Sequence, residues 1–261
     1  MTFPSPNDQQ PPLEPAETAE QPAAPQYIEV KIELPTRNPL VTYVILVVTI
    51  LVYLAQMATE YLLGGDLPAF LGMKINAYIQ AGQLWRLITP VLLHGSLLHI
   101  GFNMYALYNI GRGLEQYYGS ARFLLLYLIA GFAGNTASFI FSSANSLGAS
   151  TAIFGIVAAE GVFIYHNRSL FGRNAGRMLS QIGMVVLVNL MLGLSPGIDN
   201  WGHLGGLLGG LAFAWFAGPR FQPQLNPPRL ANATPAQRAW LTAALEAAAI
   251  AALVAFTLAS R

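Results

Sequence analysis

Seven apolar stretches, most of them close to 20 residues long, set the limits on what this chain can fold into. The stretches run over about 40–63, 98–117, 121–142, 149–166, 178–194, 201–217 and 239–259. Only 10% of the 261 residues are charged, whereas a soluble domain has about 25%. A helix of roughly 20 apolar residues is long enough to cross a bilayer. The sequence therefore predicts an all-α polytopic membrane protein that works in the lipid bilayer.

The polar stretches divide the chain into four parts. Residues 1–36 are rich in Pro, Gln, Ala and Glu and contain no apolar core of a signal peptide, so we expect a disordered cytosolic tail. We expect a membrane domain over 37–218, a Pro-rich cytosolic linker over 219–238 and a seventh transmembrane helix over 239–261. A semi-polar connector over about 64–97 is too long for a simple turn, and we expect it to lie in the membrane interface.

The distribution of positive charge predicts the orientation. With the N-terminus inside, ten of the 13 Lys and Arg residues fall in inner segments, as the positive-inside rule requires. We therefore expect a cytoplasmic N-terminus, an outer C-terminus and, since no transit peptide precedes the tail, a bacterial cell (inner) membrane. The chain contains no cysteine, which excludes disulfides and thiolate metal sites. Nothing in it suggests nucleic-acid binding, a metal or a cofactor.

Four polar residues open three of the predicted spans at the outer face. His99 and Asn103 open the second span, Ser150 the fourth and His203 the sixth, all within about two helical turns of the outer end. Polar groups in lipid are costly and usually face a cavity or one another. The three helices therefore place polar side chains in one layer.

These residue types can perform nucleophilic catalysis. Ser150 can attack a carbonyl if a base removes its proton, and His203 has a near-neutral reference pKa that suits this task. Free N–H groups at the helix N-terminus favour an oxyanion beside Ser150, and His99 and Asn103, at i and i+4, share a face from which both can donate. Asp199 reaches His203 only if its loop folds back, so the pattern indicates a dyad.

Two simpler explanations apply to the same residues. A lone serine in an apolar helix usually bonds to a backbone carbonyl, and a lone histidine often serves packing or proton relay. The matched depth of Ser150 and His203 favours catalysis over these roles. Gly202, Gly206 and Gly210 repeat every four residues, which lets a membrane helix approach a neighbour closely. If that neighbour is the fourth span near Gly155, Ser150 and His203 can meet.

The ordered set of motifs resembles the rhomboid family of intramembrane serine proteases. The resemblance covers about residues 40–217. Its elements are Trp85-Arg86, His94, His99, Asn103, Glu115, Gly148-Ala149-Ser150, His203, Gly206 and Gly210. It implies a six-helix core plus one C-terminal helix, with 37–218 as the rhomboid catalytic domain. It also implies that transmembrane proteins are the substrates, and it leaves the oligomeric state open.

The resemblance assigns a role to each of these residues. Ser150 would be the nucleophile and His203 the general base, with the oxyanion hole formed by His99, Asn103 and the Ser150 N–H. Phe154 would be the aromatic ring on which the histidine packs. The remaining residues would be supporting: Trp85, Arg86 and His94 in the first loop, Glu115, Gly148, and Gly206 and Gly210 between the sixth and fourth helices.

Thr151 departs from the family pattern, which has Gly after the serine. A β-branched residue there could narrow the site, change substrate choice or add a hydroxyl near the oxyanion. One alternative function is a non-catalytic relative that binds transmembrane clients for quality control. Another is a small transporter that uses Glu160 and Glu246 as a proton relay.

Overall fold

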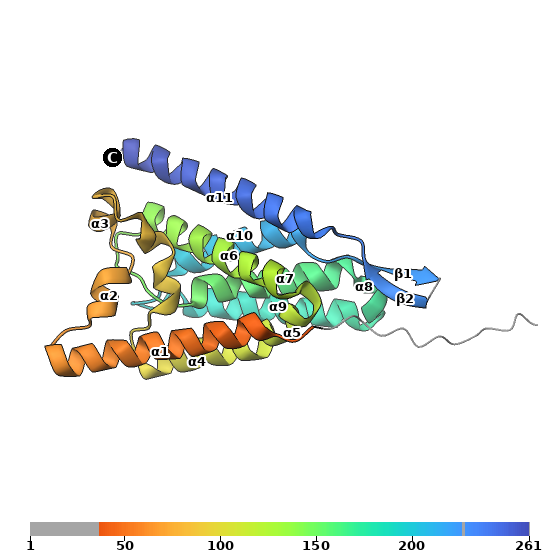
Figure 1. The fold of residues 1–261 in the computed structure, drawn as a ribbon, viewed down its shortest axis with the longest axis horizontal. Helices are drawn as coiled ribbons and strands as arrows, with labels where there is room; N and C mark the ends of the chain where they lie inside the picture. The colour runs from red at the N-terminus through yellow and green to blue at the C-terminus, as the bar shows by residue number, and fades with distance from the viewer. Residues whose placement is uncertain (1–36, 226–227, 261) are drawn as a thin grey trace, which may run out of the picture. The chain divides into compact units, whose positions relative to one another are not determined.

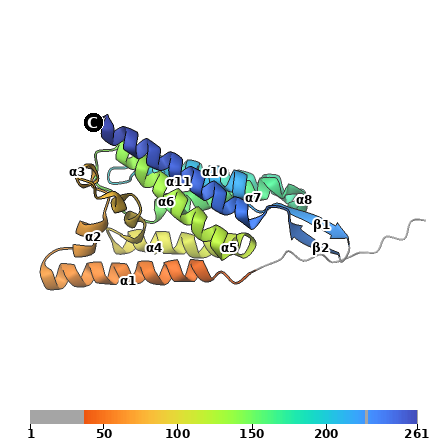
Figure 2. The same cartoon turned by 45° about the horizontal axis from the view of Figure 1, so that its top comes forward.

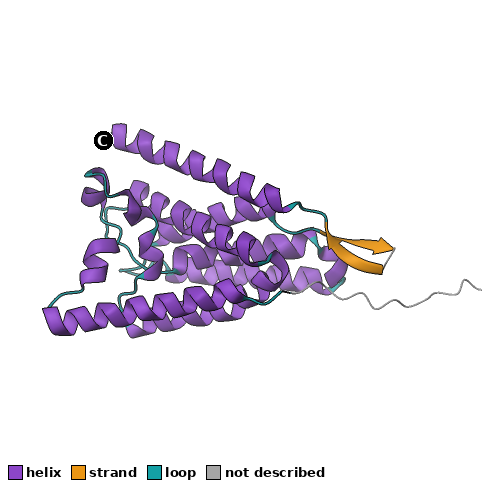
Figure 3. Cartoon of the chain, in the orientation of Figure 1, coloured by secondary structure: helices purple, strands orange, loops and turns teal. Residues whose placement is uncertain are grey.

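The computed structural model describes residues 37–225 and 228–260, and the predicted tail over 1–36 lies outside them. The chain is mostly helical (Figures 1 and 3). The long helices are α1 (Leu40–Leu63), α6 (Ser120–Phe141), α7 (Ser150–His166), α9 (Asn174–Leu192), α10 (Asn200–Ala217) and α11 (Ala236–Ala259). A further long segment consists of α4 (Leu97–Ala106), the π-helical turn η3 (Leu107–Gly111) and α5 (Arg112–Tyr118). These elements coincide with the seven apolar stretches of the sequence.

Length and composition make several of these helices suitable for crossing a membrane. Among the described residues, α1, α6, α9 and α11 are long and apolar enough to do so, and α7 is a shorter apolar helix. Such helices satisfy their backbone hydrogen bonds internally, as a lipid environment requires. The predicted all-α polytopic fold is confirmed, and the protein is a multi-pass integral membrane protein.

Three helices, α6, α7 and α10, form the centre of the bundle, with α1 and α11 outside them (Figures 1 and 2). In the most apolar window of α6, 61% of the residues are buried, against 22% in α1 and in α11. The outer helices therefore leave most of their apolar surface for lipid, while the central three carry the buried core.

The connector between α1 and α4 folds into four short helices. These are α2 (Leu67–Gly72), α3 (Asn76–Gln80), η1 (Leu84–Leu87) and η2 (Thr89–Leu92). The connector is tied to the α6–α7 loop, because the fully buried Lys74 donates through Nζ to the Ser142 and Ala144 carbonyls at 2.9 and 2.7 Å. These bonds make the connector a packed cap on the bundle.

The segment expected to be a Pro-rich linker contains a short hairpin. Strands β1 (Phe221–Leu225) and β2 (Pro228–Asn232) pair antiparallel, with Phe221 opposite Asn232, and α8 (Arg168–Phe171) lies close to them in Figure 1. Phe221 is buried, and its N–H donates to Asn167 Oδ1 at 2.7 Å. The hairpin is thus anchored to the end of α7, by a long-range contact that its local Pro content does not predict.

Candidate functional site

Ser150 and His203 lie in hydrogen-bonding contact. Ser150 is the first residue of α7, and His203 is in the first turn of α10. The Ser150 Oγ and His203 Nε2 atoms are 2.9 Å apart, and His203 is 9% exposed. A hydroxyl at this distance from an imidazole nitrogen has the geometry needed to pass a proton to it.

Local backbone features fix where each of the two helices begins. Gly148 has φ of 135°, a conformation that favours glycine, and its N–H donates to the Pro90 carbonyl at 2.9 Å. This turn delivers Ser150 to the start of α7. The Asp199 carboxylate accepts the Gly202 N–H at 3.0 Å and so caps α10. Asp199 therefore fixes the helix that carries His203.

The imidazole of His203 is held by an aromatic ring. Phe154 stacks on it with ring centroids 4.4 Å apart and planes 12° apart, which is the contact that the resemblance implied. His203 Nδ1 and the second Asp199 carboxylate oxygen are both buried without a hydrogen-bond partner among the described residues. Within the described part of the chain, the Ser-His pair thus has no bonded acid.

Two further histidines lie beside the pair. A Cβ atom at Gly148 would lie 2.7 Å from His99 Nε2 and 3.6 Å from Ser150 Oγ, so the His99 ring borders the serine. The His94 and His99 ring centroids are 5.0 Å apart. Asn103 Nδ2 donates to the His99 carbonyl at 2.9 Å and is therefore engaged within its own helix. The structure places His99 beside Ser150, whereas the Asn103 amide donates to a backbone carbonyl of its own helix, α4.

His94 supports the turn before Ser150. Its Nε2 accepts the Ala149 N–H at 3.4 Å, and burial lowers the pKa of His94 to about 3, which keeps the ring neutral and able to accept. Gln56 of α1 clamps the His94 backbone: Gln56 Oε1 accepts the His94 N–H at 3.0 Å, and Gln56 Nε2 donates to the His94 carbonyl at 3.2 Å. The role of Gln56 was not predicted from the sequence, although a polar amide within an apolar span is itself a signal.

Small residues let α10 approach α7 closely. A Cβ at Gly206 would collide with the backbone of Thr151, and one at Gly210 would collide with the backbone of Gly155. The two helices therefore touch backbone to backbone one and two turns below the Ser-His pair.

Thr151 is part of the same helix packing. Its side chain is 3% exposed, and its Cγ2 would lie 3.0 Å from a Cβ atom at Gly134 of α6 or at Gly202 of α10. Its hydroxyl has no hydrogen-bond partner among the described residues. The extra side chain at this position fills space where α6, α7 and α10 meet.

The other supporting residues lie away from the pair and hold the fold. Arg86 is 1% exposed and donates to the Phe70 and Met73 carbonyls at 2.8 Å, and Trp85 Nε1 donates to the Leu71 carbonyl at 3.0 Å. Both bind the connector together.

Glu115 joins three helices. Its fully buried carboxylate accepts the Val41 and Thr42 N–H groups and the Thr42 hydroxyl of α1 at 2.7–2.9 Å, and the Ser120 hydroxyl of α6 at 2.6 Å. Four hydrogen bonds compensate the burial of this charge.

The remaining intramembrane acids are not joined to the pair. Both Glu246 carboxylate oxygens are buried without a hydrogen-bond partner among the described residues, so Glu246 shares no hydrogen bond with Glu160. Within the described part of the chain, no group of three or more His, Cys, Asp or Glu residues is placed to hold a metal ion.

Comparison with known proteins places the chain in a family. The family model of the rhomboid domain matches residues 81–220, which are 140 of the 261 residues. The chain is 40% identical over 174 residues to the rhomboid protease GluP of Bacillus subtilis (strain 168), covering 66% of this chain and 34% of the relative. It is 35% identical over 162 residues to RHOMBOID-like protein 1 of Arabidopsis thaliana, covering 60% and 41%.

A third relative is matched over a larger share of its own length. RHOMBOID-like protein 5 of Arabidopsis thaliana is 34% identical over 177 residues, covering 64% of this chain and 57% of the relative. The chain thus spans between 34% and 57% of the length of these three relatives. The matched domain includes η1, the Ser-His pair and the helices that carry it, and the chain belongs to the rhomboid family of membrane proteins.

Proposed function

We propose that this chain is an intramembrane serine endopeptidase that cleaves transmembrane segments of other membrane proteins. The observation that carries the proposal is the 2.9 Å contact between Ser150 Oγ and His203 Nε2. The family membership supports it, because one relative is named a rhomboid protease.

The mechanism follows from the two side chains. Ser150 Oγ attacks the carbonyl carbon of the scissile bond while its proton passes to His203 Nε2. The tetrahedral intermediate collapses, the C–N bond breaks, and the proton moves from His203 to the departing amine. Water then gives a proton to His203 and attacks the acyl-enzyme, and Ser150 is regenerated as the proton returns to its oxygen.

The developing negative charge needs donors at the start of α7. The Ser150 N–H lies at a helix N-terminus, and the His99 ring borders the serine. Asn103 contributes a donor once its amide exchanges the His99 carbonyl for the oxyanion. In this proposal 37–218 is the catalytic membrane domain, 219–238 a cytosolic linker and 239–261 an additional membrane helix.

The proposed setting is a bacterial inner membrane with a cytoplasmic N-terminus and an outer C-terminus. Substrates would carry Gly or Pro near the cut, because a regular helix hides its carbonyls and these residues weaken it. Ser150 then lies near the outer face, where water reaches it most easily.

The test is cleavage of a single-span substrate in proteoliposomes. Ser150→Ala and His203→Ala should each reduce kcat by at least about a thousandfold, since both groups act as one unit. Ser180→Ala, on the exposed side of α9, and His166→Ala, at the far end of α7, are matched controls that should stay active.

Two outcomes would contradict the proposal. If Ser150→Ala cleaves the substrate at the full rate, Ser150 is not the nucleophile. A wild-type protein that binds the substrate, never cuts it and resists a serine-directed fluorophosphonate would instead be a client-binding relative.

A further inference from the structure

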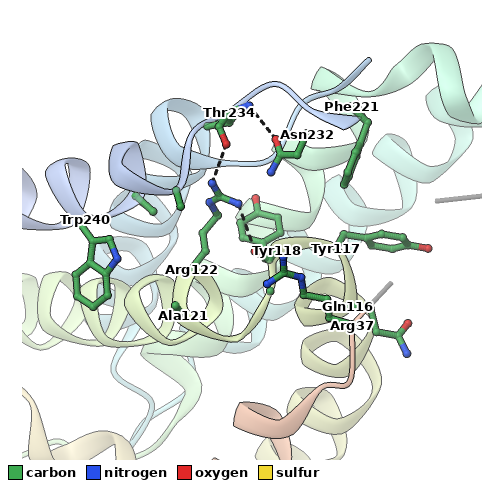
Figure 4. Close-up of a pocket in the computed structure, with 13 residues that line it drawn as sticks. Arg37, Gln116, Tyr117, Tyr118, Ala121, Arg122, Phe221, Asn232, Thr234 and Trp240 are labelled. Carbon is green, nitrogen blue, oxygen red and sulfur yellow. Dashed lines mark hydrogen bonds between the residues drawn. The ribbon is translucent and has the colours of Figure 1, made fainter. Parts of the chain in front are cut away.

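A cavity of about 230 Å³ lies beside the beginnings of α6 and α11 (Figure 4). Its walls are the turn between α5 and α6, the hairpin β1–β2 and the first turns of α11. Ser150 opens α7, which follows α6 in the opposite direction, so the beginning of α6 and the beginning of α7 face opposite ends of the bundle (Figure 2). The cavity is therefore separate from the Ser-His pair.

Two arginines line this cavity. Arg37 comes from the chain before α1, and Arg122 comes from the first turn of α6 (Figure 4). None of the described residues that line the cavity is Asp or Glu. Two like charges that share a small space repel each other, and an anion between them removes this repulsion.

Arg122 is a buried cation whose donors are incompletely used. It is 8% exposed, and it donates to the Tyr118 carbonyl at 3.3 Å and to the Thr234 and Pro235 carbonyls at 3.1 and 3.2 Å. Its Nε is buried without a partner among the described residues. Neutral carbonyls orient the guanidinium but do not neutralise it, and a buried charge without a counter-ion is costly.

Arg37 adds an accessible second charge. It is exposed, while its backbone N–H donates to the Gln116 carbonyl at 3.0 Å and holds the residue at the cavity wall. Its Nη1 would lie 3.5 Å from a Cβ atom at Gly119, so the guanidinium rests against the α5–α6 turn. Guanidinium groups present planar donors that match the oxygens of a phosphate.

The position of the cavity favours a lipid as the source of the anion. It lies where the apolar helices α6 and α11 begin, which is the depth of the headgroups for a helix that crosses the bilayer. Trp240, 60% exposed on α11, lines it, and tryptophan is enriched at this interface. Basic pockets between membrane helices bind anionic headgroups.

We propose that this cavity binds the phosphate of an anionic phospholipid headgroup between Arg37 and Arg122. The bound lipid would tie α6 to α11 and the hairpin at this face. The binding is independent of proteolysis, so the failure of either proposal leaves the other intact.

The test is native mass spectrometry of the full chain in detergent micelles, titrated separately with phosphatidylglycerol, phosphatidylcholine and inorganic phosphate. Phosphatidylglycerol should bind at least about tenfold more tightly than phosphatidylcholine, because both lipids carry the phosphate but the quaternary ammonium of choline neutralises the headgroup and brings a further positive charge to the two arginines. Arg37→Gln should remove most of this preference. Arg238→Gln changes an exposed arginine in the first turn of α11 that does not line the cavity, and it should keep the preference.

Arg37→Gln is the main variant because Arg122→Gln also removes bonds to Thr234 and Pro235 and so tests folding as well. Equal binding of both lipids by the wild type overturns the proposal. If Arg37→Gln and Arg238→Gln lose the preference for phosphatidylglycerol equally, the lipid is attracted to a charged surface in general, and the proposal is overturned as well. If inorganic phosphate binds and the protein shows no preference between the two lipids, the site binds free phosphate, and the lipid proposal is overturned.

Discussion

Gly206→Ala tests whether the close approach of α10 to α7 sets the Ser-His geometry. A Cβ atom at this position would meet the Thr151 carbonyl oxygen and carbon at distances that real Cβ contacts do not show, and would lie 3.2 Å from the Thr151 Cα. All three atoms belong to backbone, so no side-chain rotation relieves the collision. The helices have to move apart.

The structure gives the size of the effect. Ala is favoured over Gly in a helix by about 1 kcal/mol, whereas overpacking a tight interface costs about 1–3 kcal/mol or more. The net result should be a lower free energy of unfolding. Moving α10 outward by about 1 Å would also stretch the contact between Ser150 Oγ and His203 Nε2 beyond 2.9 Å. A misplacement of this size reduces the rate by about a hundredfold.

The assay combines thermal unfolding in micelles with cleavage in proteoliposomes. Gly183→Ala on α9 is the matched control, because a Cβ there has nothing within 4 Å. It should raise the unfolding temperature slightly and leave cleavage unchanged. If Gly206→Ala behaves like Gly183→Ala in both measurements, close helix packing does not position the pair.

Four further changes probe other parts of the structure. Glu115→Ala removes the buried acceptor of four hydrogen bonds and should lower the free energy of unfolding by at least about 3 kcal/mol; an unchanged unfolding temperature would contradict this. Glu246→Gln replaces an ionisable carboxyl group, whose two oxygens are buried without a partner among the described residues, by an amide that carries no charge, and it should raise the unfolding temperature, so a fall would refute the reasoning. Phe154→Leu loses the ring stacked on His203 and should lower kcat/KM about tenfold, and an unaltered value would separate stacking from activity. The pKa of His94 is about 3 in the fold and 6.5 ordinarily, so below pH 6.5 only the unfolded chain gains a proton and stability should fall by up to about 1.4 kcal/mol per pH unit; His94→Gln should flatten this dependence, and an equal slope in both proteins would exclude His94 as its source.

The sequence was sufficient to predict the long helices because their signal is local. An apolar run near 20 residues, bounded by Pro or Gly, defines each span without knowledge of its neighbours. The short helices of the connector and the hairpin were not predicted, because their conformation depends on distant partners. Lys74 bonds to carbonyls of the α6–α7 loop, and Phe221 bonds to Asn167 at the end of α7. No local pattern encodes such pairs.

Some features of the candidate site could likewise be predicted from the sequence, and others could not. Matched depth indicated that Ser150 and His203 could form a pair, and the glycine repeat indicated that α10 approaches a neighbouring helix closely. The sequence left the role of Asp199 open, and the structure shows it capping α10. The clamp of Gln56 on His94 was not predicted, because an amide in an apolar run indicates a polar contact but does not identify its distant partner.

The absence of a bonded acid changes what has to position the base in the proposed mechanism. In a triad a carboxylate holds the imidazole through Nδ1, but the Nδ1 of His203 has no partner among the described residues. Orientation then comes from the Phe154 ring, from the cap at Asp199 and from the backbone contact of Gly206 with α7. These packing contacts act together, so a substitution in any of them should change the distance between Ser150 and His203 even where it does not touch the serine. We therefore infer that the geometry of the pair depends on the junction of α6, α7 and α10, where Thr151 fills the space beside Gly134 and Gly202.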